Sequence, residues 1–149
     1  MSKVSKLSKQ SKPKVDIERN KLGKKIRREV VGAEYDDQLQ NAESDFSQPI
    51  RDYTTENLWG RVWADNTLSR KTRSLLNVGL TTAFRCSHET KVHIRGALNN
   101  GATREEIRAV LMQVMMYAGI LAVREAVRGA NQVFAEEDAK KQKKLAKKR

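Results

Sequence analysis

The sequence predicts an all-helical protein built around one main domain. Apolar residues recur at spacings of three and four along most of the 149-residue chain, which is the period of an amphipathic helix. Ser, Thr, Asn and Gly stand where these patterns begin and end, as expected for helix caps. No segment shows the alternation of apolar and polar residues that is typical of a strand. These observations favour a helical bundle.

The first helical pattern covers residues 22–42, with the sequence LGKKIRREVVGAEYDDQLQNA. Its apolar residues, at spacings of four, one, four and four, are Ile26, Val30, Val31, Tyr35 and Leu39. Gly32 interrupts the pattern, so we expect a helix that is broken there.

A second amphipathic stretch follows Pro49, and its two tryptophans, Trp59 and Trp63, lie four residues apart. Asp65 and Asn66 predict its end, because both residue types favour turns.

Ser69 is a suitable N-cap for the next helix, and the apolar residues of that helix nearly encircle it. They are Leu75, Leu76, Val78, Leu80, Ala83 and Phe84. We therefore expect this helix to lie at the centre of the fold. The helix after it should stop at Asn99-Asn100-Gly101, because Asn and Gly tolerate left-handed backbone angles.

Thr103 and Glu106 have the spacing of a capping box at the start of the clearest helical pattern in the chain. Gly119 separates this helix from the last one. The apolar stripe of the last helix consists of Val123, Ala126, Val127, Ala130, Val133 and Phe134. The segment KKQKKLAKKR has enough helix formers to extend it by a turn or two.

Charge divides the chain into three parts. Residues 1–28 hold eleven basic and two acidic residues, and residues 140–149 hold seven basic and no acidic residues. The remainder, with twelve basic and sixteen acidic residues, is net acidic. We therefore predict a basic disordered tail over 1–21, a helical domain over 22–139, and a basic C-terminal tail over 140–149.

Composition excludes several classes of protein. The single cysteine, Cys86, excludes an intrachain disulfide framework, a cysteine-rich zinc site and redox catalysis by paired cysteines. No apolar run reaches the roughly 20 residues that cross a bilayer, so we expect no membrane partner and a cytoplasmic protein. The basic tails leave nuclear or organellar targeting and weak polyanion binding open.

Cys86, Glu89 and His93 follow one another at spacings of three and four, which places them along one stripe of a helix. A carboxylate four residues from an imidazole can fix its tautomer and raise its pKa, as an acid/base pair requires. The same spacing also fits a surface ion pair beside a small buried thiol. His88 lies on another face, where we expect solvent, and no zinc site forms from these residues because a third strong ligand is missing.

The segment HIRGALNNGATREEIRAVLMQVMMYAGI resembles the H-x-R-x-A-L-N-N-G-x-T-x-E-E-I signature of gamma-carboxymuconolactone decarboxylases. The resemblance extends from KKIRREVVGAEY to about Phe134. It implies the helical bundle of the alkyl hydroperoxidase D-like superfamily, assembled as a ring-shaped homotrimer or homohexamer. It also implies decarboxylation or isomerisation, without metal or organic cofactor, of a carboxylated unsaturated lactone or a related carboxylated aromatic in aromatic-compound catabolism.

The related hydroperoxidase branch carries C-x-x-C-x-x-x-H on this helix. Here Cys86 and His93 keep the outer positions, Glu89 replaces the second cysteine, and Ser74 stands in place of a proton-relay glutamate. Without a resolving thiol in the chain a peroxidase cycle does not close, so a thiol-dependent peroxidase is the alternative rather than the leading hypothesis.

The resemblance also directs the choice of site residues. His93 is the candidate acid; Glu89 either orients it or delivers the proton itself, and Cys86 completes the catalytic group. Because a bidentate guanidinium suits a small carboxylate substrate, the candidate substrate ligands are Arg73, Arg85 and Arg95. A third hypothesis is an oligomeric protein that binds polyanions through its basic tails.

Overall fold

The computed structural model of the protein describes residues 15–41 and 44–147, and within these ranges the chain is helical and contains no strand. The helices are α1 (Ile17–Val31), α2 (Ala33–Asn41), α3 (Gln48–Thr54), the π-helix η1 (Thr55–Val62), α4 (Arg70–Ala83), α5 (Ser87–Asn99), α6 (Arg104–Ala118) and α7 (Ile120–Ala146). The all-helical prediction is confirmed. Residues 1–14 of the predicted disordered tail lie outside the described residues, but residues 17–21 belong to α1, so the prediction of disorder is wrong for them.

The predicted helix boundaries are confirmed where a local signal defines them. Ser69 caps α4 by accepting a hydrogen bond from the backbone N–H of Thr72. Thr103 and Glu106 form both bonds of a capping box at the start of α6. Gly32 ends α1 with a φ of 94°, a left-handed conformation that glycine adopts without a steric penalty.

Two boundaries differ from the prediction. Helix α1 begins at Ile17 rather than Leu22, because the Asp16 side chain caps it by accepting from the backbone N–H of Arg19. The predicted second helix is α3 followed without interruption by the wider turns of η1. Apolar periodicity does not distinguish a π-helix from an α-helix of this length.

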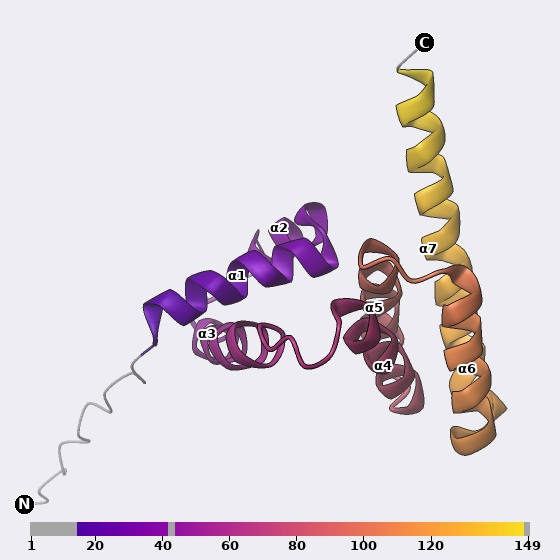
Figure 1. The fold of residues 1–149 in the computed structure, drawn as a ribbon, viewed down its shortest axis with the longest axis horizontal. Helices are drawn as coiled ribbons and strands as arrows, with labels where there is room; N and C mark the ends of the chain where they lie inside the picture. Colours follow the sequence, from indigo (N-terminus) through magenta and orange to yellow (C-terminus); the bar gives the residue numbers. More distant parts are fainter. Residues whose placement is uncertain (1–14, 42–43, 148–149) are drawn as a thin grey trace, which may run out of the picture.

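The helices enclose two hydrophobic cores, and α5 contributes to both. The larger core lies among α4, α5, α6 and α7; its members include Val78, Ile94, Ile107, Leu111 and Val133. The smaller core lies among α1, η1 and α5, and it consists of Ile26, Val30, Val31, Trp59, Trp63 and Val92. Figure 1 shows the same division, with α1, α2 and α3 on one side of the molecule and α4 to α7 on the other.

Helices α1 and η1 are in backbone contact at two glycines. A Cβ atom on Gly23 would lie 2.1 Å from the carbonyl oxygen of Thr55, and one on Gly60 would lie 2.4 Å from that of Arg19. No side chain fits in either place, so glycine at both positions permits the close approach. The contact sets the position of η1 and of the cleft described below.

Helix α4 is not enclosed in the single chain, which differs from the prediction of a central helix. Its inward residue Val78 is fully buried, but Leu76, Leu80 and Phe84 are 53%, 44% and 74% exposed. Helix α4 packs on α5 and α6 and less extensively on α7, and no other described helix covers its remaining surface extensively. The encircling apolar pattern is real, but neighbours within the chain cover only part of it.

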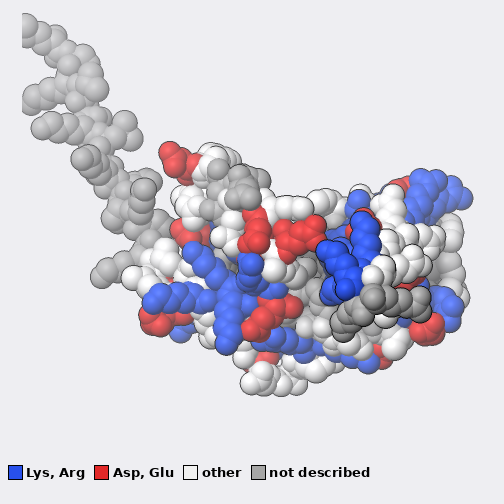
Figure 2. Space-filling view, turned by 90° about the horizontal axis from the view of Figure 1, so that it is seen from above, with Lys and Arg blue, Asp and Glu red and all other residues white. Residues whose placement is uncertain are grey.

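Helix α7 continues to Ala146, so the predicted extension through the lysine-rich segment is confirmed over the described residues. It runs well beyond the other helices towards the C terminus (Figure 1). On the face shown in Figure 2, basic and acidic side chains are interspersed. Across residues 15–41 and 44–147, no helix combines the length and apolar character needed to cross a bilayer.

The larger core predicts a clear difference between two truncations. Ile94→Ala should lower the free energy of unfolding by about 2–5 kcal/mol, because it removes a fully buried side chain and leaves a cavity. Leu145→Ala, at a 66% exposed position of α7, is the control and should change it by less than about 0.5 kcal/mol. Urea denaturation followed by circular dichroism measures both, and equal losses would contradict this account of the core.

Candidate functional site

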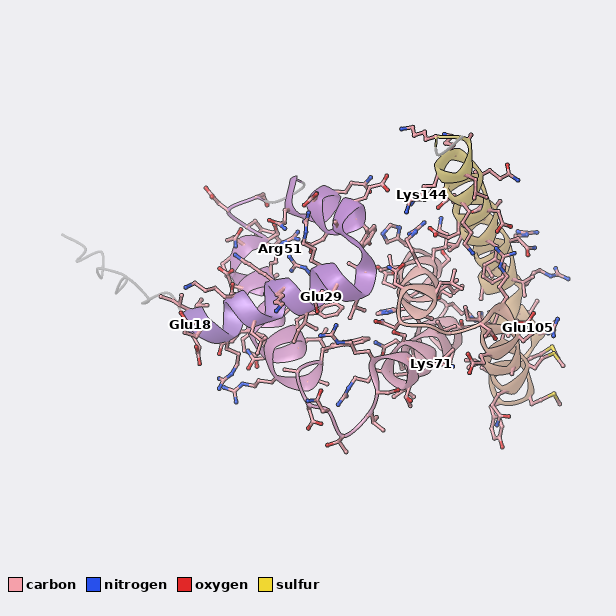
Figure 3. All side chains as sticks on the ribbon, turned by 45° about the horizontal axis from the view of Figure 1, so that its top comes forward. Glu18, Glu29, Arg51, Lys71, Glu105 and Lys144 are labelled. Carbon is pink, nitrogen blue, oxygen red and sulfur yellow. The ribbon has the colours of Figure 1, made fainter. Side chains whose placement is uncertain are left out.

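A cleft of about 590 Å³ lies where α1, α2, α3, η1 and α5 meet. Its wall combines apolar side chains of the smaller core with a set of polar groups. The polar groups with ionisable or hydroxyl side chains are Arg27, Tyr35, Ser47, Arg51, Thr54, Thr55, Glu89 and His93. Figure 3 shows Arg51 among the N-terminal helices that form this side of the molecule.

Glu89 and His93 both line the cleft from α5, so two of the three predicted catalytic residues lie together. No hydrogen bond joins these two side chains, both of which belong to the described residues. Their coupling is electrostatic: burial lowers the pKa of His93 below the ordinary histidine value, and the Glu89 charge opposes this shift. His93 is therefore mainly neutral near pH 7.

Arg27 is a buried cation at the cleft wall, with 4% of its surface exposed. Its Nε donates to the carboxylate of Asp36, which is itself 1% exposed, and its Nη1 donates to Thr55 Oγ1 over 3.0 Å. Gln40 donates to the second oxygen of Asp36 over 2.9 Å. The guanidinium is thus held in one orientation by three helices, α1, α2 and η1.

Arg51 brings a second guanidinium to the same cleft from α3. Two arginines on different helices are a suitable arrangement for a carboxylate, because the planar fork of a guanidinium matches a carboxylate in two parallel hydrogen bonds. The two arginines can bind an anion in the cleft. Glu89 and His93, which line the same cleft, can transfer a proton.

Tyr35 lines the cleft from α2, and its Oη lies 3.1 Å from Nε2 of His88. His88 is exposed, as the sequence predicted, but its ring is in contact with Tyr35, with 6.2 Å between ring centroids. Burial raises the pKa of Tyr35, the Glu89 charge raises it further, and Arg95 lowers it. The phenol therefore keeps its proton through the neutral range.

The other predicted site residues do not line this cleft. The Cys86 thiol is exposed at the start of α5 and lies 3.7 Å from the carbonyl oxygen of Phe84. Arg73 donates to the backbone oxygen of Asp65 over 3.0 Å. The remaining two arginines are Arg85, which is exposed with a φ of 58°, and Arg95, which pairs with Glu136 over 2.6 Å. Their assignment as catalytic or substrate-binding groups stays a prediction.

Sequence reasoning missed three residues of the cleft, and one of them had a visible signal. Arg27 lies next to Ile26 and four residues after Gly23, on the stripe of α1 that packs against its neighbours. A basic residue on a buried stripe is unusual and indicates a buried partner. By its spacing Tyr35 belongs to the apolar stripe of residues 22–42, and nothing in the local pattern distinguishes Arg51 from a surface arginine.

Metal binding has no obvious place in the described part of the chain. No group of three or more His, Cys, Asp or Glu side chains comes together there. In the cleft itself, the only side chains of these types are Glu89 and His93.

Comparison with known proteins agrees with the fold and with the resemblance seen in the sequence. Residues 49–132 match the model of the carboxymuconolactone decarboxylase family. The chain is 32% identical over 119 residues to the 4-carboxymuconolactone decarboxylase of Acinetobacter baylyi, covering 80% of this chain and 89% of that protein.

A second relative is the nitrosuccinic acid decarboxylase of Metarhizium robertsii, which is 41% identical over 106 residues, 70% of this chain and 73% of the relative. A third, an uncharacterised 15.0 kDa protein of Paracoccus denitrificans, is 36% identical over 84 residues, 54% of this chain and 63% of the relative. The family model matches more than half of the chain, and the Acinetobacter baylyi relative aligns with most of its own length and most of this chain. The chain therefore belongs to the carboxymuconolactone decarboxylase family.

Proposed function

We propose that this protein is a decarboxylase that acts on a small carboxylated substrate in the cleft between α1, α2, α3, η1 and α5. The observation that carries the proposal is the meeting of Arg27 and Arg51 with Glu89 and His93 in one cleft. The names of two relatives, both decarboxylases, support the same reaction class.

The substrates in those two names share a chemistry that this cleft suits. Nitrosuccinic acid and 4-carboxymuconolactone each carry two carboxylates and a group that accepts an electron pair, a nitro group in one and a conjugated lactone carbonyl in the other. We propose a substrate of this kind: a carboxylated unsaturated lactone, or another small dicarboxylic acid with such an acceptor. The two arginines would hold the carboxylate that remains in the product.

The proposed reaction needs a proton but no redox step. The bond between the substrate carbon and its leaving carboxylate breaks, carbon dioxide departs, and the electron pair moves onto oxygens of the acceptor group. A proton from His93 then bonds to the substrate carbon. His93 is mainly neutral near pH 7, but a bound dianion favours the imidazolium and so raises the pKa of His93, as Glu89 already does in part.

The alternative of a thiol peroxidase finds less support in the site. Cys86 lies outside the cleft that holds His93, and Glu89 stands where the second cysteine of the peroxidase motif would be. Polyanion binding by the basic tails has one favourable observation: Lys141, Lys143 and Lys144 are exposed on the far end of α7. We propose it as a weak, salt-sensitive property that accompanies catalysis.

We further propose that the protein assembles into a ring of three or six copies through the corner between α6 and α7. Residues 109–123 contain no charged side chain. The exposed apolar residues of this corner are Met112, Met116, Tyr117, Ile120 and Leu121. Several large apolar side chains exposed within one short segment are more typical of an interface than of a free surface.

Assembly through this corner has a direct test. Leu121→Glu, at a position 63% exposed in the single chain, should convert the oligomer to single chains, because it places an unpaired charge in the interface. Sedimentation velocity measures the change. Val62→Glu, at a 48% exposed position of η1, is the matched control and should leave the oligomer intact. A single-chain wild-type protein would disprove the assembly.

The proposed chemistry is tested by carbon dioxide release from 4-carboxymuconolactone and from nitrosuccinic acid, without added metal or cofactor. His93→Gln should lower kcat by about 10²–10⁴-fold, as expected for loss of general acid catalysis. Arg51→Gln should lower kcat/KM about 10–100-fold through loss of charged hydrogen bonds to the substrate.

Arg61→Gln, on the exposed side of η1, is the control for the arginine substitution and should retain full activity. Absence of release from both compounds with wild-type protein would refute the proposed substrate class. Full activity of His93→Gln would instead remove His93 from the mechanism.

The pH profile should report the coupling between Glu89 and His93. Glu89→Gln removes the charge that raises the pKa of His93, so the imidazole should titrate at a still lower pH than in the wild type. Histidine ring signals in NMR, assigned with His93→Gln, measure this directly, and the inflection of kcat/KM should move in the same direction. An unchanged midpoint would show that Glu89 does not influence His93.

A further inference from the structure

We propose that Tyr35 is a catalytic hydrogen-bond donor to the oxygen that receives the electron pair, and that His88 positions its hydroxyl group. This inference rests on the proposed decarboxylase function and narrows its substrate class. The acceptor must present an oxygen atom to Tyr35, as a nitro group or a conjugated carbonyl does.

The position of Tyr35 fits this role. Its side chain is half-buried and lines the cleft together with Glu89 and His93. The hydroxyl group is fixed by the imidazole of His88, whose Nε2 lies 3.1 Å away, and the two rings are tilted by 40°. Tyr35 therefore reaches the cleft from α2, whereas the proton-transfer pair reaches it from α5.

Among the four hydroxyl groups that line the cleft, Tyr35 is the one best placed to donate to a substrate. Ser47 Oγ donates to the backbone oxygen of Ser44 over 3.2 Å, and Thr54 Oγ1 donates to that of Ile50 over 2.8 Å. Thr55 is 1% exposed and its Oγ1 is in contact with the buried Arg27 guanidinium, so it is less accessible to a substrate than the half-buried Tyr35. The partner of the Tyr35 hydroxyl group is Nε2 of His88. When Nε2 carries the proton, the imidazole donates to the phenol oxygen, and the phenol hydrogen is left for the substrate.

The chemistry of the step explains why a neutral donor is useful there. In the nitro acid, loss of carbon dioxide leaves a nitronate, with the electron pair of the broken carbon–carbon bond on the nitro oxygens. A donor placed at these oxygens stabilises the nitronate more than the nitro group, because charge develops there during the reaction. Burial and the charge of Glu89 raise the pKa of Tyr35, which keeps it in the donating form.

The experiment separates this inference from the reaction itself by measuring binding. The probes are 3-nitropropanoate and its preformed nitronate, which carries the same charge on its nitro oxygens as the expected intermediate. Binding is followed by rapid-mixing measurements of tryptophan fluorescence, because Trp59 lines the cleft. Wild-type protein should bind the nitronate more tightly than the nitro acid.

Tyr35→Phe should weaken nitronate binding about 10–100-fold and change binding of the nitro acid by less than about twofold, since the donor acts on developed charge. Tyr53→Phe, at a 68% exposed position of α3 outside the cleft, is the matched control and should bind both probes as the wild type does. Equal nitronate affinity in wild type and Tyr35→Phe, or no nitronate preference in the wild type, would overturn the inference.

Two further measurements test the effect of Tyr35 on turnover and the positioning role of His88. With nitrosuccinic acid, Tyr35→Phe should lower kcat and leave KM nearly unchanged. His88→Gln, which retains a side-chain N–H, should preserve much of the nitronate preference that His88→Leu loses. The double variant with Tyr35→Phe and His88→Leu should be no weaker than Tyr35→Phe alone, and additive losses would refute positioning by His88. Wild-type protein that prefers the nitronate but releases no carbon dioxide would contradict the proposed function and leave the donor role of Tyr35 supported.

Discussion

The buried ion pair between Arg27 and Asp36 is the interaction on which the cleft depends. It joins α1 to α2 across the turn at Gly32, and Thr55 connects the same guanidinium to η1. Separating the pair would leave a charge buried without its partner, which costs several kcal/mol. The pair therefore fixes the relative positions of three helices and presents a cation at the cleft wall in one orientation.

Helix α5 holds the two cleft residues that are proposed to transfer the proton, Glu89 and His93, in a fixed position. One side of it packs into the larger core through Ile94, and the other side reaches the smaller core through Val92. Glu89 and His93 lie on the part of the helix that faces the cleft. Because a helix packed on both sides has little freedom to rotate, Glu89 and His93 keep their place relative to the arginines of the cleft.

Much of the fold could be predicted because the signals are local. The cap at Ser69, the box at Thr103 and the break at Gly32 each act within a few residues of sequence. The proximity of Glu89 and His93 followed from helical spacing in the same way. Arg51 and Tyr35 could not be placed by such reasoning, because their meeting depends on the contact of α1 with η1 and on the turn at Gly32.

The apolar corner lies on α6 and α7, whereas the candidate cleft is formed by α1, α2, α3, η1 and α5, so the two share no helix. Substitutions at the wall formed by α2 and α3 therefore alter what fits the cleft without changing the surface proposed for assembly. A change at Ile50 or Ser47, for example, reshapes the cleft at positions distant in sequence from residues 109–123. This separation makes the scaffold evolvable: the shape of the cleft can diverge between relatives while the surface proposed for assembly is retained.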